Sequence, residues 1–454
     1  MVKYVYKWPK DISNNKTISS NNVFKEIDNR YCGQDRCRFL LPVYISEQES
    51  KAQLHFRQIA FLAGKLGRTI VLPNVHNSHL GSCLPHPFRF YYDQSWLDNN
   101  KEHFKYITME DFKEWVLERR FAGAIPTAQE IFLQGVRKSR LMEKAKNCFQ
   151  SSFDFSNRPI VGYQVPDHHN PLDLNITNIF VNLLSDEARE YEYFTYKDQL
   201  SPNEEDHGIN NNKATDLLSS SSPPPPVDVI NLFYDRRYKF IEDQDANIPL
   251  PYNQKWVEIA DKISSQLKPY VAIHWRMETL KPVSNLLPCA KDLIDKISQL
   301  TSQKAPNVFL LTDYPHLLNT TGARPESSSF NAKQLVSEHH EAIQYLYEHT
   351  NITLTSINNG KIPYAELPSQ NWHILPINAT SSEDNLPLDR SVLGIVDKLV
   401  AMNAQWFFAG RPGVCAKASS FTGRISHSRL DAFMKGDKNV IIPIKTFDIK
   451  KEEN

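Results

Sequence analysis

The sequence predicts an α/β protein with two lobes that face a central cleft, each lobe built on a mainly parallel sheet covered by helices. Three observations predict this class: apolar strand-like runs alternate with helical periodicity, the alternation occurs twice, and a low-complexity segment separates the two occurrences. The length of 454 residues, 41% of them hydrophobic and 23% charged, suits a folded chain with a sizeable core. Wholly disordered, collagen-like and coiled-coil classes are excluded.

Shifts in composition divide the chain into segments. Residues 1–30 are expected to be flexible, because the stretch SNNKTISSNN within them is polar and unpatterned. Residues 203–227 contain NNN, SSSS and PPPP, and are expected to form a low-complexity linker or a long surface loop. The two lobes are then expected at residues 31–202 and 228–454.

The first lobe opens with a strand, a helix and a second strand. A continuous apolar run at residues 39–45 predicts a buried strand. Ser46 and Glu49 have the spacing of a capping box, which predicts the start of a helix. Apolar residues at helical spacing continue to Leu66, and residues 68–73 predict the next strand. Such a β-α-β unit implies parallel strands in a doubly wound sheet.

The second lobe repeats this alternation. Its expected helices cover residues 256–267, 291–300 and 392–402, and its expected strands cover residues 270–275, 308–312, 406–410 and 439–444.

Charge and hydropathy limit the partners. Lys plus Arg and Asp plus Glu number 52 each, so no bulk charge favours nucleic acid or an anionic membrane. No apolar run approaches the roughly 18 residues of a membrane span, and the N-terminus lacks the apolar core of a signal peptide. We therefore expect no nucleic acid partner and no membrane span in this chain.

The six cysteines are too few and too scattered for a zinc module. Cys32 and Cys37 are close enough to form a disulfide in an oxidising compartment, and two free thiols are the alternative. Five glycosylation sequons permit a secretory location without arguing for it; they begin at Asn15, Asn175, Asn319, Asn351 and Asn378.

Polar residues that end the strand at residues 270–275 form the first candidate site. A side-chain period of two places His274, Arg276 and Glu278 on one face if the strand continues. Arginine suits a pyrophosphate, because its planar guanidinium gives bidentate hydrogen bonds at any working pH. The alternative is an ion pair between Arg276 and Glu278 that ties the strand end to a loop, with His274 in the core.

Two further candidates follow later strands. Asp313 ends the strand at residues 308–312, where a carboxylate can accept hydrogen bonds from a guanine or ribose edge or can simply hold a turn. After the strand at residues 406–410, a helix start with free N–H groups and hydroxyls predicts an anion site or ordinary capping. Its residues are Ser419, Ser420, Phe421 and Thr422.

Competing motifs are weaker. Asp243 and Asp245 form an Asp-x-Asp pair that could hold a divalent metal ion, but the surrounding EDQDANIP is typical of a solvated loop. A zinc helix at residues 339–341 would need histidine at Gln344, and the histidines at residues 168–169 lack a spaced partner. No hydrolase elbow and no Walker loop occurs.

In this order, the segments resemble the GDP-fucose-dependent O-fucosyltransferases. HWRME with Cys289 following is similar to the His-x-Arg-x-Glu segment of the plant/fungal-type branch. VFLLTDY resembles the family strand that ends in Thr-Asp, and FFAG followed by KASSFTGR resembles its Ser-Ser-Phe-Thr segment. Residues 53–73 resemble the N-terminal helix and strand of the first lobe. The matching blocks run from about Leu41 to Thr422.

The resemblance implies a GT-B fold of two Rossmann-like lobes, with the nucleotide sugar held by residues 228–454 and the acceptor by residues 31–202. It implies a metal-independent, inverting transfer of L-fucose from GDP-fucose to a protein or glycan hydroxyl in the ER or Golgi lumen, without a cofactor. Arg276 would stabilise the leaving β-phosphate with help from Glu278. The other donor contacts would come from His274, Asp313, Ser419, Ser420, Phe421 and Thr422.

One departure from the family concerns the loop before the first helix. The family has a glycine-rich loop there that ends in Asn-Gln, whereas residues 46–51 of this chain contain no glycine. Glu47 or Glu49 could act as a general base toward an acceptor hydroxyl, because a desolvated carboxylate has a raised pKa. The alternatives are a catalytically inactive nucleotide-sugar- or glycan-binding relative, and a metal-dependent transferase that uses Asp243 and Asp245.

Overall fold

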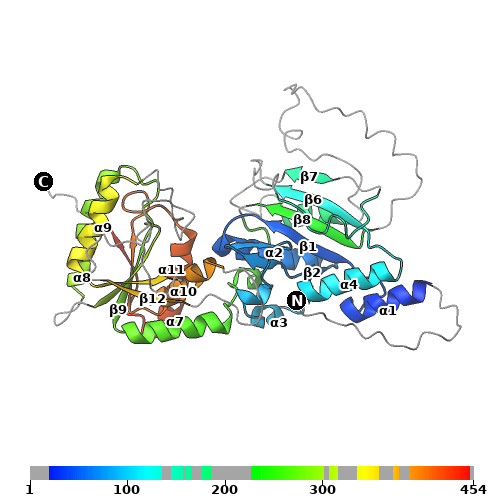
Figure 1. Ribbon diagram of the computed structural model, residues 1–454, viewed down its shortest axis with the longest axis horizontal. Helices are drawn as coiled ribbons and strands as arrows, with labels where there is room; N and C mark the ends of the chain where they lie inside the picture. The colour runs from blue at the N-terminus through cyan, green and yellow to red at the C-terminus, as the bar shows by residue number, and fades with distance from the viewer. Residues whose placement is uncertain are drawn as a thin grey trace, which may run out of the picture.

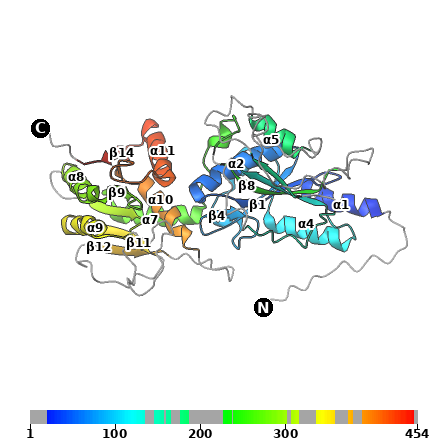
Figure 2. The ribbon, with the colours of Figure 1, turned by 90° about the horizontal axis from the view of Figure 1, so that it is seen from above.

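The computed structural model consists of two α/β lobes that lie side by side (Figures 1 and 2). The chain passes from one lobe to the other before helix α7 (Gln254–Leu267). The structure describes residues 20–134, 145–156, 160–164, 176–185, 226–236, 238–300, 306–314, 335–356, 372–377 and 389–449.

The first lobe is built on a mainly parallel sheet. Strand β1 (Phe39–Ile45) lies in its centre, between β2 (Thr69–Val71) and β8 (Val229–Asp235), and is parallel to both. The sheet continues through parallel pairs to β5 on one side and to β6 and β7 on the other, and an antiparallel hairpin of β3 and β4 pairs with the end of β1. The bounds are β3 (Asn74–His76), β4 (His79–Gly81), β5 (Tyr106–Ile107), β6 (Ala128–Gln134) and β7 (Val161–Gln164).

Helices cover both faces of this sheet (Figure 2). Helices α1 (Ser20–Cys32) and α4 (Met109–Phe121) lie on one face, and α2 (Glu49–Lys65) with α5 (Ile176–Leu184) lies on the other. Each face of the sheet carries its own hydrophobic core. Residues of β1 pack into both cores, because successive side chains of a strand point to opposite faces. The short helix α3 (Ser95–Asn99) packs at the edge through Trp96 and Leu97.

The second lobe has a wholly parallel sheet in the order β12, β11, β10, β9, β13, β14. Helices α8 and α9 pack on one face, and α7, α10 and α11 pack on the other. The strands are β9 (Tyr270–Trp275), β10 (Asn307–Thr312), β11 (Ile352–Ser356), β12 (Trp372–Pro376), β13 (Trp406–Gly410) and β14 (Ile442–Phe447). The helices are α8 (Leu286–Ser298), α9 (Ser337–His349), α10 (Ser391–Met402) and α11 (Ser420–Met434).

The fold class is therefore as predicted, but the boundary between the lobes is not. Strand β8 follows the predicted linker, yet it pairs with β1 and β6 in the first sheet. The predicted start of the second lobe at residue 228 is thus too early. The predicted linker itself lies outside the described residues up to residue 225, and composition carries no information on which sheet the next strand joins.

Two local predictions near the N-terminus also need correction. Helix α1 begins at Ser20, so the predicted flexible segment of residues 1–30 ends in a helix. Helix α2 begins at Glu49 with Gln48 at the N-cap, and no side chain caps it. The predicted capping box at Ser46 is absent because the Glu49 side chain is used elsewhere, as described below.

All six cysteines form disulfides, and no free cysteine remains. The Cys32–Cys37 bond follows the first of the two sequence alternatives. The other bonds join Cys83 to Cys148 and Cys289 to Cys415, partners that are 65 and 126 residues apart in the sequence. Within the described ranges, no helix is both long and apolar enough to cross a membrane.

Candidate active site

The order of strands in the second lobe indicates where a ligand would bind. The chain runs outward from β9 through β10 and β11 to β12, and then returns to the other side of β9 as β13 and β14. Strands β9 and β13 therefore flank a topological switch point, and ligands of open parallel sheets bind beyond the carboxyl ends of the strands at such a point. All three predicted clusters follow strands β9, β10 or β13 at this edge.

His274 connects the first predicted cluster to the third. Its Nδ1 atom lies 2.6 Å from Oγ1 of Thr422, and its ring stacks on Phe421 with centroids 5.0 Å apart. Burial, reinforced by the nearby charge of Arg276, lowers the pKa of His274 to about 3. The imidazole is therefore neutral at physiological pH, and it can exchange hydrogen bonds with a ligand but cannot contribute positive charge.

Arg276 follows the end of β9 and is partly exposed, and a buried carboxylate beneath it holds its position. Its guanidinium forms an ion pair with Glu278, and the Lys417 ammonium group lies 3.0 Å from the same carboxylate oxygen. The Glu278 side chain is 2% exposed and that of Arg276 is 25% exposed. The buried carboxylate thus orients two cations toward the edge of the sheet, and the ion-pair interpretation of Arg276 is compatible with a role in ligand binding.

Asp313 links the ends of β9 and β10. Its two carboxylate oxygens accept hydrogen bonds from the backbone N–H groups of Met277 and Glu278, at 2.9 and 3.2 Å. Burial raises the pKa of Asp313 to about 7, and the neighbouring Glu278 contributes to the increase. Each oxygen retains a further lone pair, so Asp313 can both hold the turn and accept a hydrogen bond from a ligand.

Helix α11 presents its N-terminus at the switch point. The Ser419 hydroxyl caps the helix by accepting a hydrogen bond from the Phe421 N–H group, and Ser420 is exposed. The preceding loop is fixed by the disulfide to Cys415, whose carbonyl accepts a hydrogen bond from the Trp275 indole at 2.8 Å. A fixed helix N-terminus with free N–H groups and hydroxyls is suited to an anion.

A buried polar network joins the first lobe to the second beside this site. The Lys398 ammonium group forms an ion pair with Glu49 and donates to the Tyr252 hydroxyl at 2.8 Å. The same ammonium lies 5.0 Å from the centre of the Phe421 ring. Glu49 also accepts a hydrogen bond from Tyr92. The charge of Lys398 holds the pKa of Glu49 below its usual value despite burial.

These contacts exclude the role of general base for Glu49. Its carboxylate is already bonded to an ammonium group and two tyrosine hydroxyls, so it has neither the raised pKa nor the access that a base requires. Glu47 is different, because its side chain is 23% exposed and lies 3.5 Å from the Lys51 ammonium group. Glu47 has a φ of 79°, a left-handed conformation that usually favours glycine.

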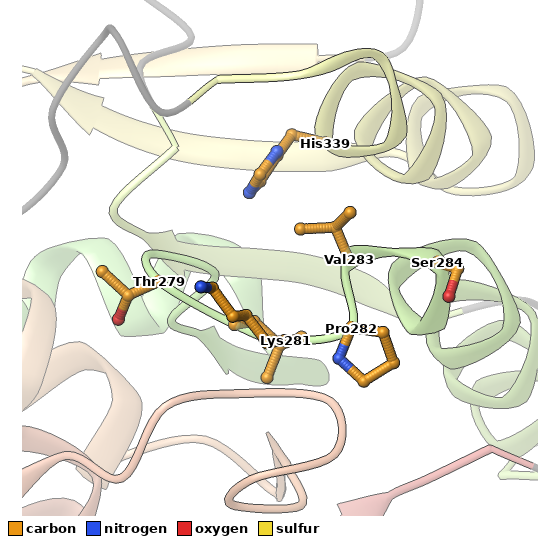
Figure 3. A pocket seen from close by; sticks show the side chains of 7 residues that line it. Thr279, Lys281, Pro282, Val283, Ser284 and His339 are labelled. Atoms are coloured by element: carbon orange, nitrogen blue, oxygen red, sulfur yellow. The ribbon is translucent and has the colours of Figure 1, made fainter.

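A pocket of about 950 Å³ begins at Thr279, the residue that follows Glu278 in the sequence (Figure 3). The loop after β9 forms most of it, and His339 of α9 faces that loop from the opposite wall. The lining is mainly apolar, with Lys281 projecting over it. Such a pocket beside a row of polar groups is suited to a flat heterocyclic base. The remaining lining residues are Thr279, Leu280, Pro282, Val283 and Ser284.

Two clusters in the described part of the chain have side chains that could bind a metal ion. Asp243 and Asp245 approach His103 on a partly exposed loop of the first lobe, in keeping with the solvated-loop interpretation. In the second cluster, His76 and His86 meet Asp389, whose carboxylate already accepts hydrogen bonds from Tyr91 and backbone groups. The predicted motif at residues 167–169 lies outside the described residues, and residues 339–341 lie in α9.

Three contributors were not predicted from the sequence. Lys417, Lys398 and Tyr252 each place a polar group in or beside the site. A signal existed for Lys417, which lies in the KASSFTGR segment. None existed for Lys398, because a lysine within an apolar helix stripe looks like a surface residue.

The model of the family described as GDP-fucose protein O-fucosyltransferase matches residues 51–430. No curated protein matches the sequence. Among solved structures, POFUT1 in complex with GDP-fucose is 14% identical, with 91% of this chain and 98% of that chain covered and a TM-score of 0.39. POFUT1 in complex with GDP is 13% identical, with 90% of this chain and 98% of that chain covered and a TM-score of 0.43. The fucosyltransferase NodZ from Bradyrhizobium is 12% identical, with 86% of this chain and 93% of that chain covered and a TM-score of 0.35.

Proposed function

We propose that this chain, which belongs to the GDP-fucose protein O-fucosyltransferase family, transfers L-fucose from GDP-fucose to a hydroxyl group of a protein or glycan with inversion at the sugar carbon. The observation that carries the proposal is the contact between His274 and Thr422 at 2.6 Å. It brings the polar end of β9 and the N-terminus of α11 together at the switch point, where a sugar nucleotide would bind.

In the proposed reaction, the acceptor oxygen attacks the anomeric carbon as the bond from that carbon to the phosphate oxygen breaks. The acceptor proton passes to a base, and GDP leaves with its new negative charge on the β-phosphate. Arg276 would stabilise that charge, since a preorganised donor acts most strongly where charge develops. Glu278, buried and shared with Lys417, would orient Arg276 rather than react itself.

The nucleoside would lie between His274 and Asp313. A neutral imidazole and a carboxylate can hydrogen-bond the ribose and the guanine edge, and the pocket in Figure 3 would take the base. Ser420, Thr422 and the N–H groups at the start of α11 would hold the phosphates, with Ser419 as the cap and Phe421 against His274. With arginine and a helix start in these roles, we propose that no metal ion is needed.

Glu47 is the proposed general base. It is the remaining carboxylate of the loop before α2, and its left-handed backbone conformation is of the strained kind that proteins retain at functional positions. The acceptor would approach from the first lobe, where this loop lies.

An oxidising compartment such as the ER or Golgi lumen is the proposed location. Three disulfides that pair all six cysteines support it, because such bonds persist in oxidising compartments.

Calorimetric titration with GDP, GDP-fucose, UDP and ADP tests the donor assignment, and release of free fucose from GDP-fucose tests turnover. We expect tight binding of the guanine nucleotides and slow donor hydrolysis in the absence of an acceptor. Equal affinity for UDP and GDP would contradict the fucosyl assignment.

The second candidate is a catalytically inactive relative that binds a nucleotide sugar or glycan. The observation that favours it is the loop at residues 46–51, which lacks glycine and in which Glu49 is tied to Lys398. GDP binding without donor hydrolysis or transfer to any acceptor would support this candidate instead.

A further inference from the structure

Arg57 of α2 is a buried cation without a counter-ion. It is 4% exposed, and its Nε atom donates to the Gln53 carbonyl oxygen of its own helix at 3.2 Å. Its buried Nη1 atom has no hydrogen-bond partner in the described part of the chain. A buried guanidinium group is normally paired, so this one requires an explanation.

Arg424 belongs to the other lobe, and its charge acts on Arg57. It lies on α11, which packs against α2 (Figure 2), and its buried Nε atom also lacks a hydrogen-bond partner among the described residues. Burial lowers the pKa of Arg57 to about 10, and the charge of Arg424 is the next cause. Lys239 is close enough for the charge of Arg57 to contribute to lowering its pKa.

No acidic side chain of the described residues neutralises this pair. Glu49 is a carboxylate whose charge acts on Arg57, but it is ion-paired with Lys398. Two like charges from opposite lobes are therefore carried by helices in contact, and each guanidinium has a buried nitrogen without a hydrogen-bond partner among the described residues, an arrangement that costs free energy unless an anion binds there.

We infer that Arg57 and Arg424 form an oxyanion site between the two lobes, beside the proposed donor site. Arg424 lies one helical turn from Ser420 on the same face of α11, about 6 Å along the helix axis. Two guanidinium groups provide the forked donors that phosphate, sulfate and carboxylate groups accept.

The charge balance of the donor site favours the diphosphate of the donor as the ligand. At the strand ends, Arg276 and Lys417 are positive, Glu278 is negative and His274 is neutral. The net charge is thus at most plus one, whereas a sugar diphosphate carries one negative charge on each phosphate. This inference rests on the proposed function only for the identity of the ligand; an acidic group on the acceptor has the same chemistry and is the other source.

The test compares the parent protein with Arg57→Gln, Arg424→Gln and Lys65→Gln. Lys65→Gln removes the same charge from an exposed position of α2 and serves as the control. Affinities are measured for inorganic pyrophosphate, sulfate, guanosine and GDP, and melting temperatures with and without pyrophosphate. In anion-free buffer, Arg57→Gln should melt no lower than the parent, because a repulsive contact is removed.

We expect pyrophosphate and sulfate to bind about tenfold more weakly to both site variants, and pyrophosphate to raise their melting temperatures less than that of the parent. If the variants also bind GDP about tenfold more weakly but bind guanosine as the parent does, the donor diphosphate is the ligand. If GDP is unaffected, the site takes an acidic group of the acceptor. Anion affinities within twofold of the parent, or a fall in melting temperature for Arg57→Gln without anion, would overturn the inference. A protein that binds no guanine nucleotide would overturn the proposed function, while the pyrophosphate and sulfate titrations would still test the anion site.

Discussion

Nδ1 of His274 lies 2.6 Å from Oγ1 of Thr422, although the two residues are 148 positions apart in the sequence. His274 ends β9 and Thr422 lies in the first turn of α11, so the contact closes the switch point of the second sheet. Because the imidazole is neutral, the positive charge at this point comes from Arg276 and Lys417. At the ends of the strands, stabilisation of a departing diphosphate therefore depends on Arg276 and Lys417, in addition to the anion site inferred at Arg57 and Arg424.

Arg276→Lys should fold normally and lose most of the transfer activity. Lysine retains the charge but not the bidentate fork, and loss of a preorganised donor at a developing charge typically lowers kcat about 10²- to 10³-fold. Arg411→Lys is the control, since Arg411 is an exposed arginine paired with Asp448 at 2.6 Å. Steady-state kinetics and thermal melts of both variants provide the measurement. A kcat for Arg276→Lys within a few-fold of the parent would place the chemistry elsewhere.

GDP affinity should depend on pH through Asp313. With a pKa raised to about 7, the carboxyl group holds a proton at lower pH and cannot accept a hydrogen bond at the protonated oxygen. Binding that requires the ionised form should weaken about tenfold for each pH unit below 7 and level off above it. Calorimetric titrations from pH 5.5 to about 8.5 measure this slope. Asp313→Asn should bind more weakly and without that slope; an unchanged slope in the variant would assign the titration to another group.

Most strands and helices of the second lobe could be predicted from the sequence, whereas the contacts between the two lobes could not. Strand ends at His274 and Asp313 were found because apolar runs and their polar ends are local features of the sequence. The position of β8 between β1 and β6, and the pairing of Cys289 with Cys415, depend on contacts between distant segments. Glu49 illustrates the difference, since its local pattern predicted a cap, whereas a lysine from the other lobe determines its role.

Donor turnover should persist in EDTA, because fixed cations and a helix start would neutralise the phosphates. Asp243→Ala is the matched variant, and it should retain activity since the cluster of Asp243, Asp245 and His103 lies on a partly exposed loop of the first lobe. Activity assays after dialysis against EDTA, with and without added Mn²⁺, provide the measurement. Loss of activity that Mn²⁺ restores in the parent but not in Asp243→Ala would favour the metal-dependent alternative.

The variant Glu47→Gly distinguishes two roles of Glu47, that of a catalytic carboxylate and that of a strained loop residue without a part in the reaction. Glycine relieves a φ of 79°, so the free energy of unfolding should stay the same or rise by up to about 1 kcal/mol. If Glu47 is the base, transfer should nevertheless fall about 10²- to 10⁴-fold, and Glu47→Gln should lose as much. Ser78→Gly is the control, because Ser78 has a φ of 65° and its side chain has no proposed role in transfer. Full activity in Glu47→Gly would show that another group accepts the acceptor proton.

The ion pair of Glu49 and Lys398 should couple the stability of the two lobes. Both side chains are at least 92% buried, as their exposed fractions are 8% and 2%. Lys398→Met leaves the carboxylate buried without its counter-ion, which typically costs about 3–5 kcal/mol. The double variant Glu49→Gln with Lys398→Met removes both charges and should recover most of that loss.

The pH dependence gives an independent check on this pair. In the parent, the charge of Lys398 lowers the pKa of Glu49, so its contribution to stability is present above pH about 4.5 and is lost as the pH falls through the lowered value. In Lys398→Met, burial is the largest remaining influence and raises that pKa against the hydrogen bonds from Tyr92 and Tyr252, so the variant should instead lose stability as the pH rises above about 4.5. Denaturant unfolding at about pH 3.5 and at about pH 8 measures both slopes, because the first value lies below the ordinary pKa of a glutamate and the second lies above it. Lys435→Met, which breaks an exposed pair with Asp431 on α11, should change neither. If Lys398→Met were as stable as the parent at both pH values, the buried pair would not hold the lobes together, and the contact of α2 with α10 and α11 would depend on apolar packing alone.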